Sequence, residues 1–302
     1  MKILNFGSCN IDYVYALDHI VRPGETESSR SLSAFPGGKG LNQSIALARA
    51  GAKVYHAGCI GQDGGFLKQL LFANGVDVSC IDTVEGKNGH AIIQLSRDGE
   101  NSIFLYPGSN EMLTRAQIDD VLGKFAPGDL LLLQNEINEL PYIIDAAYAR
   151  GMGIVLNPSP MNDAIRALDF GKLSWLILNE VEAADISGAY GEEEILHWFR
   201  RRYPALKVML TLGKRGCACW DGADCLHHPI FPVSVVDTTA AGDTFTGYFI
   251  AGVAAAMDMQ QVLRRASCAA AIAVSRKGAA PSIPETEEVE QMLKQWTEGE
   301  KP

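Results

Sequence analysis

Short hydrophobic runs alternate with longer segments whose hydrophobic positions recur every three or four residues, from about residue 129 onward. Short continuous runs are typical of strands buried on both faces, and the longer period is typical of helices packed on one face. The pattern predicts an α/β fold with a mostly parallel sheet. Strands are expected at Leu130–Leu133, Gly153–Leu156, Trp175–Leu178, Val208–Leu212, Gly216–Trp220, Cys225–His228 and Val233–Val236, and helices at Leu140–Arg150, Glu180–Ile186, Glu192–Tyr203, Ala241–Met257, Met259–Ser275 and Glu285–Trp296.

The first 128 residues add segments in which polar and apolar residues alternate one by one. This alternation is typical of strands with one exposed face. We expect them to form a small β excursion from residues 12–34 and 88–106, within a single domain of residues 1–302. The exposed strands are expected at Val14–Leu17, Thr26–Ser33, His90–Leu95 and Ser102–Tyr106; the other elements are strands Lys2–Phe6 and Val54–Ile60, a helix through Arg49, and helices Phe66–Asn74 and Thr114–Phe125.

The whole chain is organised around Val233–Thr246, where an apolar run leads through small residues into a long apolar helix. Small residues at such a turn let backbone N–H groups point at a ligand, and a helix N-terminus favours negative charge. Asp243 places a carboxylate inside this turn. It either caps the helix or takes a proton from a hydroxyl that attacks a bound phosphoryl group.

Polar side chains follow six of the predicted apolar strands. Because open α/β sheets bind ligands at the carboxyl ends of their strands, these side chains predict one shared site. Their richness in Asn, Asp and Glu fits a ligand with many hydroxyl groups. They are Asn10 and Asp12; Gln134, Asn135 and Glu136; Asn157; Asn179 and Glu180; the segment Gly213–Gly216; and Asp237.

Two further motifs have both a structural and a functional interpretation. Gly37–Asn42 is a glycine-rich turn into a helix that matches neither the P-loop nor a dinucleotide-binding motif. It is either an ordinary turn or a binding site in which Lys39 holds ligand hydroxyls close to the backbone. Asn179 and Glu182 lie three residues apart at a helix start, where they either cap the helix or anchor Mg²⁺ through water.

Composition and charge limit the possible partners. The chain of 302 residues is 47% hydrophobic and 21% charged, with a formal net charge of −10 and no cluster of Lys and Arg. This argues against nucleic acid or an anionic membrane surface as the main partner. No apolar run is long enough for a membrane span, and the N-terminus does not look like a signal peptide.

Seven scattered cysteines are typical of reduced thiols and predict a cytoplasmic protein. Cys217, Cys219 and Cys225, with His227 and His228, have poor spacing for zinc, so buried strand cysteines are the favoured interpretation.

Taken together, the motifs resemble those of the ribokinase-like, or PfkB-type, carbohydrate kinases. The resemblance covers essentially the whole chain, with every motif in family order. It implies a three-layer sandwich with a mostly parallel central sheet and a small β lid, which in relatives often forms a dimer. The matching stretches are Gly7-x-x-Asn10-x-Asp12, Gly37-Gly38-Lys39-Gly40-x-Asn42-Gln43, Asn179-x-x-Glu182, Asp237–Asp243, and an ending of the ribokinase type at Arg276-Lys277-Gly278-Ala279-x-Pro281-Ser282-x-Pro284.

The resemblance also implies residue roles. Asp243 matches the catalytic base, and the backbone of Ala241, Gly242 and Asp243 matches the anion hole for the phosphoryl group. The implied sugar contacts are Asn10, Asp12, Gly38, Lys39, Asn42 and Glu136. The implied ATP contacts are Asn179 and the segment Thr211–Gly216 with Gly213 and Gly216, and Ser267 stands where relatives commonly carry His near the adenine. Glu182 matches the Mg²⁺-linked acid, and a monovalent-cation loop is matched by Asp237, Thr239, Ala273, Arg276, Gly278 and Ser282.

We therefore expect an ATP-dependent sugar kinase that uses Mg²⁺ and K⁺ and phosphorylates the terminal hydroxymethyl of a pentose or similar sugar. Ribose is the leading expectation. Fructose, a ketodeoxy sugar acid or a nucleoside are alternatives: a cationic group facing the sugar would favour the acid, and an apolar lid with a base-sized pocket would favour the nucleoside. The alternative from another class is a non-catalytic sugar-binding or regulatory protein, whose mark would be the loss of Asp243 or Gly242, and both residues are present.

Overall fold

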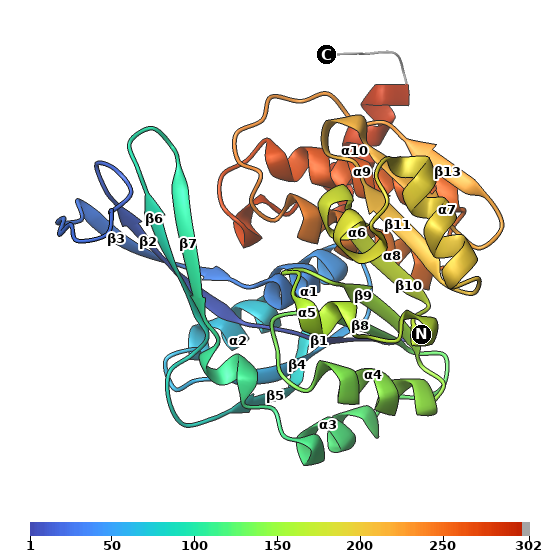
Figure 1. Ribbon diagram of the computed structural model, residues 1–302, viewed down its shortest axis with the longest axis horizontal. Coiled ribbons are helices and arrows are strands. Elements are labelled where there is room, and N and C mark those ends of the chain that lie inside the picture. The colour runs from blue at the N-terminus through green and yellow to red at the C-terminus, as the bar shows by residue number, and fades with distance from the viewer. Residues whose placement is uncertain (298–302) are drawn as a thin grey trace.

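A nine-stranded sheet forms the centre of the protein (Figure 1). The computed structural model describes residues 1–297, so the last five residues of the predicted domain lie outside the described part. All neighbouring strands pair in parallel except at one edge, where β12 pairs antiparallel with both β11 and β13. The strands, in spatial order, are β13 (Cys225–His228), β12 (Cys217–Trp220), β11 (Lys207–Thr211), β10 (Trp175–Asn179), β9 (Gly153–Asn157), β8 (Leu130–Gln134), β1 (Ile3–Phe6), β4 (Val54–Ile60) and β5 (Asp77–Thr83).

Helices cover both faces of this sheet, because successive side chains of a strand point to opposite faces. In β8, Leu130 and Leu132 join one hydrophobic cluster, and Leu131 and Leu133 join the other. The three layers match the predicted fold class. On the first face lie α1 (Lys39–Arg49), α2 (Gly65–Ala73), α8 (Ala241–Ala254), α9 (Met259–Val274) and α10 (Thr286–Thr297); on the second lie α3 (Arg115–Leu122), α4 (Leu140–Ala149), α5 (Asp163–Arg166), α6 (Glu180–Ser187) and α7 (Glu192–Arg202).

A second, four-stranded sheet stands away from these layers, at the left in Figure 1. The central strands β2 (Asn10–Ala16) and β6 (His90–Leu95) pair in parallel. The flanking strands β3 (Ser31–Gly37) and β7 (Asn101–Tyr106) pair antiparallel with them. The β6–β7 hairpin is the predicted one. By contrast, β3 begins five residues later than the predicted Thr26 and runs to Gly37, so the chain enters α1 almost directly from this small sheet.

The predicted strand Val233–Val236 is wrong. The segment has no regular secondary structure and pairs with no strand in the part of the chain that the structure describes, and Val235 and Val236 are 64% and 52% exposed. Its backbone bonds instead to the end of α9, where the N–H groups of Val236 and Asp237 both donate to Val274 O (2.8 and 3.2 Å). A β-branched run becomes a strand only where a partner edge is available. The strand β5 (Asp77–Thr83) was not predicted from the sequence.

The described helices include none that combines the length and the apolar character needed to cross a membrane.

Candidate active site

Asp243 lies in the first turn of α8 and is 8% exposed. The residue before the helix, Ala240, has φ of 59°, a left-handed conformation that turns the chain sharply into α8. Asn42 Nδ2 donates to Asp243 Oδ2 (3.1 Å), and Gln43 Nε2 donates to Oδ1 (2.9 Å). The carboxylate is therefore held by two amides from α1.

The first turn of α8 also leaves backbone donors free. Among the described residues, no acceptor pairs with the N–H groups of Gly242 and Asp243, whereas Thr244 N donates to Ala240 O (2.8 Å). A Cβ built on Gly242 would meet no atom within 4 Å, so its surroundings are open space. Free N–H groups at a helix N-terminus form an anion-binding site.

The glycine-rich turn at the start of α1 packs against the end of β1. Gly38 has φ of 94°, and a Cβ on Gly40 would lie 2.4 Å from Ser8 N, so neither position accepts a larger residue without strain. Lys39 follows within this turn. Burial alone would lower the pKa of Lys39, but the negative charges of Asp243, Glu136 and Glu182 outweigh it and raise that pKa.

Two carboxylates lie on the other side of Lys39. Glu136 Oε2 accepts from Ser8 Oγ and from Lys39 N (3.0 Å). Burial raises the pKa of Glu136, although these bonds and the Lys39 charge oppose it. Asp12 has no hydrogen-bond partner among the described residues, and burial together with the charge of Glu136 raises its pKa to about 6. Asp12, unlike Glu136, is thus short of hydrogen-bond partners within the described part of the protein.

Asn10 is 5% exposed and lies next to this pair. Its Oδ1 accepts from Asn110 Nδ2 (2.6 Å), and Asn110 Oδ1 accepts from Cys9 N (3.1 Å). The Cys9 N–H can only donate, which fixes the Asn110 amide and in turn the Asn10 amide. Asn10 therefore presents its N–H donors away from Asn110. Gly89 makes room for this contact, since a Cβ there would lie 2.0 Å from Asn110 Nδ2.

A cavity of about 220 Å³ opens on the helix side of Lys39 and joins residues from distant parts of the chain. Asn179 and Glu182 form a capping box at the start of α6: Asn179 Oδ1 accepts from Glu182 N (2.9 Å), and Glu182 Oε2 accepts from Asn179 N (3.0 Å). The structural interpretation of this motif is confirmed. Both residues nevertheless line the cavity, together with Lys39, Asn157, Ser159, Thr211, Thr238, Ala240, Gly242, Asp243 and Thr246.

The remaining predicted nucleotide contacts, Gly213, Gly216 and Ser267, are not among the residues that line this cavity. Gly213 begins a single 3-10 turn (Gly213–Arg215) after β11 and Gly216 follows it, with φ of 55° and 95°. A Cβ on Gly216 would lie 2.1 Å from His228 O, so the turn itself requires glycine there. Ser267 lies on α9, 8% exposed, with its Oγ 3.7 Å from Cys217 Sγ.

The predicted cation loop joins two segments through Asp237. Asp237 Oδ1 accepts from Thr239 N (2.9 Å) and Oγ1 (2.6 Å), and Oδ2 accepts from Gly278 N (2.9 Å). Partial burial alone would raise the pKa of Asp237, but these three bonds outweigh it and lower that pKa. The other predicted members follow along the second segment: Ala273 O accepts from Arg276 N (3.1 Å), Arg276 pairs with Glu288, and Ser282 is fully buried.

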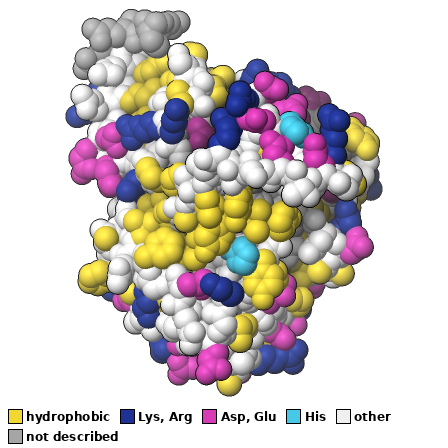
Figure 2. Space-filling view, turned by 90° about the vertical axis from the view of Figure 1, so that its left-hand side faces the viewer, with side chains coloured by type: hydrophobic (Ala, Val, Ile, Leu, Met, Phe, Trp, Pro, Cys, Tyr) yellow, Lys and Arg dark blue, Asp and Glu magenta, His cyan; other side chains and the backbone are white. Residues whose placement is uncertain are grey.

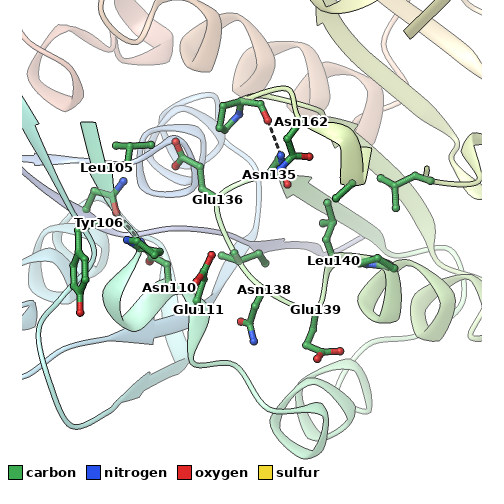
Figure 3. Close-up of a pocket in the computed structure, with 17 residues that line it drawn as sticks. Leu105, Tyr106, Asn110, Glu111, Asn135, Glu136, Asn138, Glu139, Leu140 and Asn162 are labelled. Carbon is green, nitrogen blue, oxygen red and sulfur yellow. Dashed lines mark hydrogen bonds between the residues drawn. The ribbon is translucent and has the colours of Figure 1, made fainter. Parts of the chain in front are cut away.

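A larger cavity, of about 410 Å³, lies beyond Glu136 and Asn10 (Figure 3). In Figure 3, Tyr106 and Asn110 approach it from the small-sheet side, and Asn135 and Asn162 from the opposite side. None of its described lining residues is Lys or Arg, whereas three are Glu. This side of the site therefore disfavours an anionic ligand.

Several residues of the site received no role from the sequence. Gln43 stood inside a recognised motif but received no role of its own. Of the residues predicted only as members of the shared site, Asn157 lines the smaller cavity, whereas Gln134 is 1% exposed and lines neither cavity. Asn110 had no such signal, because it lies in a 3-10 turn (Gly108–Glu111) beyond the β6–β7 hairpin and only the fold brings it to Asn10. Ser8, which donates to Glu136, is a further small polar residue that only the fold reveals.

The fold corresponds to that of known ribokinase structures, and the sequence itself places the chain in a family. The sequence pattern described as "pfkB family carbohydrate kinase" matches residues 1–286, and the chain belongs to this family. It is therefore a carbohydrate kinase, an enzyme that transfers a phosphoryl group to a sugar hydroxyl.

Relatives with assigned activities cover nearly the full chain. A ribokinase from Bacillus subtilis is 35% identical over 297 residues, which are 97% of this chain and 99% of that protein. The structure of a ribokinase from Cryptococcus neoformans in complex with ADP superposes with a TM-score of 0.85 at 34% identity, covering 97% of this chain and 99% of that one. A ribokinase from Arabidopsis thaliana, complexed with ribose and ATP, has a TM-score of 0.85 at 28% identity, with 97% and 98% coverage.

Proposed function

We propose that this enzyme transfers the γ-phosphoryl group of ATP to the terminal hydroxymethyl group of ribose. The observation that carries the proposal is the position of Asp243: a buried carboxylate between a helix N-terminus with free donors and a cluster of carboxylates and amides around Lys39. The relatives named as ribokinases support ATP and ribose as the substrates.

The acceptor sugar is proposed to bind Asp12, Glu136, Asn10, Lys39 and Asn42, against the backbone of Gly38. Within residues 1–297, Asp12 has no hydrogen-bond partner, and Asn42 Oδ1 is buried without one. A buried polar atom without a partner costs free energy, which ligand hydroxyls would recover. The set includes both donors and acceptors, as a polyhydroxy ligand requires.

Asp243 would then accept the proton of the attacking hydroxyl as the phosphoryl group is transferred. The N–H groups of Gly242 and Asp243 would hold the phosphoryl oxygens, with Ala241 opening the helix. Because phosphoryl transfer passes through a loose transition state, positioning and charge stabilisation account for most of the catalysis. Lys39, whose pKa is raised, remains a cation and balances part of the negative charge.

The nucleotide is proposed to occupy the smaller cavity, with Asn179, Thr211, Gly213, Gly216 and Ser267 along its path. Two carboxylates, Asp243 and Glu182, and a single lysine line this cavity. The phosphates of ATP would be repelled there unless a divalent cation accompanied them. Glu182 uses only Oε2 in the capping box, and its second oxygen has no partner among the described residues. Such a donor fits Mg²⁺, which keeps several waters and substrate phosphates as ligands and shields negative charge.

We further propose that the segments of Asp237, Thr239 and Ala273, Arg276, Gly278, Ser282 bind K⁺ through backbone carbonyls. Asp237 joins the two segments directly. The cation would stabilise the loop that precedes α8, and hence the helix N-terminus. Replacing K⁺ by tetramethylammonium, which is too large for such a loop, is expected to reduce the rate.

The small sheet is proposed to act as a lid over the sugar and as the interface of a homodimer, within a single kinase domain. Asp12 lies on its inner face, by strand alternation and its pairing with Phe35 and Ala91. The outer face carries Phe104 and Leu32, which are 54% and 53% exposed, and Figure 2 shows hydrophobic side chains gathered over this side of the molecule. Sedimentation of the native protein and of Phe104→Lys, expected to be a dimer and a monomer, tests the interface.

A reducing compartment with ATP suits this enzyme, and we place it in the cytoplasm. All seven cysteines are free thiols, and six of them are buried.

A second acceptor class has a specific observation in its favour. The larger cavity has a volume within the range of drug-sized ligand sites, and Leu105 and Tyr106 of the small sheet line it. A pentose with a substituent at C1, such as a nucleoside, would fit there. A sugar acid is disfavoured because the described lining lacks a cationic side chain.

The deciding experiment is a coupled ADP-release assay over pentoses, hexoses, sugar acids and nucleosides, with Mg²⁺ and with or without K⁺. Ribose is expected to give the highest kcat/KM, and Asp243→Asn is expected to abolish most of the turnover. A nucleoside as the best acceptor would replace the ribose assignment. Sugar binding without any turnover would favour a non-catalytic binding protein, and unimpaired transfer by Asp243→Asn would remove Asp243 as the base.

A further inference from the structure

The Asp243 carboxylate is approached from inside the protein as well as from the ligand side. Asn42, which belongs to the proposed sugar contacts, holds Oδ2, whereas Gln43 holds Oδ1 with a distance of 2.9 Å. Gln43 is fully buried and lines neither of the two cavities. Its amide therefore meets the carboxylate without meeting the substrate, which is the arrangement of a group that orients another.

The orientation of the Gln43 amide is set from one side by Asn157. Asn157 Nδ2 donates to Ile177 O (3.0 Å), and a backbone carbonyl can only accept. Asn157 Oδ1 must therefore face Gln43, whose Nε2 donates to it (3.0 Å). The same Nε2 group then points to Asp243, because a reversed amide would place two oxygens against each other.

A second chain of bonds sets the same orientation from the opposite side. Asn5 Nδ2 donates to Gly40 O (2.8 Å), so Asn5 Oδ1 faces Gln134 and accepts from its Nε2 (3.0 Å). Gln134 Nε2 also donates to Gln43 Oε1 (2.7 Å). Two backbone carbonyls in different parts of the fold thus require that Gln43 presents a donor, and not an acceptor, to Asp243.

The packing of α1 on α8 keeps this contact at a constant distance. A Cβ on Gly247 would lie 2.4 Å from Ala46 Cβ and 2.8 Å from Leu47 N, so the two helices touch with no side chain between them. A neutral amide donor on a rigid helix stabilises the ionised form of a carboxylate and fixes the direction of its free lone pairs.

We propose that Gln43 is a positioning residue for Asp243, holding the carboxylate so that its remaining lone pairs face the hydroxyl that is to be phosphorylated. This inference rests on the proposed function, since it assigns Asp243 as the base. Gln43 itself touches neither the substrate nor the reacting atoms.

Gln43→Met tests the donor, and Gln134→Met is its matched control. Both positions carry glutamine, both are at most 1% exposed, and both belong to the same buried network, but only Gln43 contacts Asp243. We expect kcat for the best sugar to fall about 100-fold in Gln43→Met, the size of effect that a misplaced reacting group produces, with KM for sugar and ATP within about threefold of native. Gln134→Met is expected to keep kcat within about threefold, because Asn157 still orients Gln43.

A second variant gives a readout that lost packing would not move. Gln43→Glu keeps the shape of the side chain but places a carboxyl against Asp243, and two carboxyls at this distance share one proton. The acid limb of the kcat/KM profile is expected to move to higher pH, so that activity lost at pH 7 returns at alkaline pH. Lys39 on α1, Glu136 after β8 and Glu182 on α6 also face this region, and they are unchanged between native and variant.

Three results would overturn the inference: native kcat in folded Gln43→Met, equal losses of kcat in Gln43→Met and Gln134→Met, or a pH profile of Gln43→Glu identical to native. Thermal unfolding of each variant establishes that it is folded. If Gln43→Met does not fold, the profile of the near-isosteric Gln43→Glu decides alone. Failure of the proposed function is a separate outcome, because the native enzyme itself would then show no turnover on the sugar panel.

Discussion

Replacing Asp12 by Asn is expected to stabilise the sugar-free protein while impairing sugar binding. The Asp12 carboxyl is largely buried, lies over Gly37, and has no hydrogen-bond partner among the described residues. Burial and the nearby charge of Glu136 raise its pKa from 3.8 to about 6. The protein thus carries an ionised group in an unfavourable place, where the hydroxyls of a sugar would be its missing partners.

The size of this cost follows from the two pKa values. The difference between 3.8 in the unfolded chain and about 6 in the folded protein corresponds to about 3 kcal/mol of destabilisation. For a carboxyl with a raised folded pKa, the folded state binds the extra proton between these values. The cost is therefore fully present above pH 6, decreases as the pH falls from 6 towards 3.8, and is absent below that range.

Urea unfolding of native protein and Asp12→Asn at pH 8, 6 and 4 measures the effect. We expect the variant to be more stable by about 1–3 kcal/mol at pH 8, somewhat below the full cost because the new amide also lacks a partner, with no gain at pH 4. Asp18→Asn, at an exposed ion pair with Arg30 and Arg97, serves as control and should show no such pH dependence. A variant no more stable than native at pH 8, or equally stabilised at pH 4, would refute the reasoning.

Further predictions follow from contacts around the same site. Gly247→Ala should destabilise the protein by about 1–3 kcal/mol in thermal unfolding and lower kcat more than KM, because the new Cβ separates α1 from α8; unchanged kcat would contradict this. Asn110→Asp cannot donate to Asn10, so the Asn10 amide should reverse and raise sugar KM about tenfold while ATP KM stays constant in steady-state kinetics. Glu182→Gln preserves the capping box and hence the melting temperature, but the Mg²⁺ concentration for half-maximal rate should rise about tenfold; a lowered melting temperature with unchanged Mg²⁺ dependence would reverse the assignment.

The elements that were predictable from sequence are those with local causes. The run Leu130–Leu133 is apolar at every position because both faces of its strand are covered. Thr114 caps the start of α3 and forms a capping box with Gln117, a motif that can be recognised from four consecutive residues. The glycine-rich turn at the start of α1 was also recognisable from the sequence. Gly38 has a positive φ and Gly40 lies close to the backbone of Ser8, so both positions require glycine.

The elements that sequence misplaced depend on distant partners. Val233–Val236 has the composition of a strand, but it pairs with no strand among the described residues, and the Val236 N–H donates to Val274 O at the end of α9 instead. The Asn10–Asn110 contact joins residues 100 positions apart and carries no periodic signal. Such features follow from the assembled tertiary structure, so no local pattern in the chain predicts them.

The polar residues after the strands show how a local signal becomes a site. Each residue has an ordinary local reason to be polar, as the capping box of Asn179 and Glu182 demonstrates. Parallel pairing then places every carboxyl end at one edge of the sheet, and the following helices begin there with their N-termini. The same Glu182 that caps α6 thereby lines a cavity with Asp243 of α8, although the two are 61 positions apart in the sequence. Structural and functional interpretations of such a motif are therefore compatible, and only a substitution that preserves one role, such as Glu182→Gln, can measure the other.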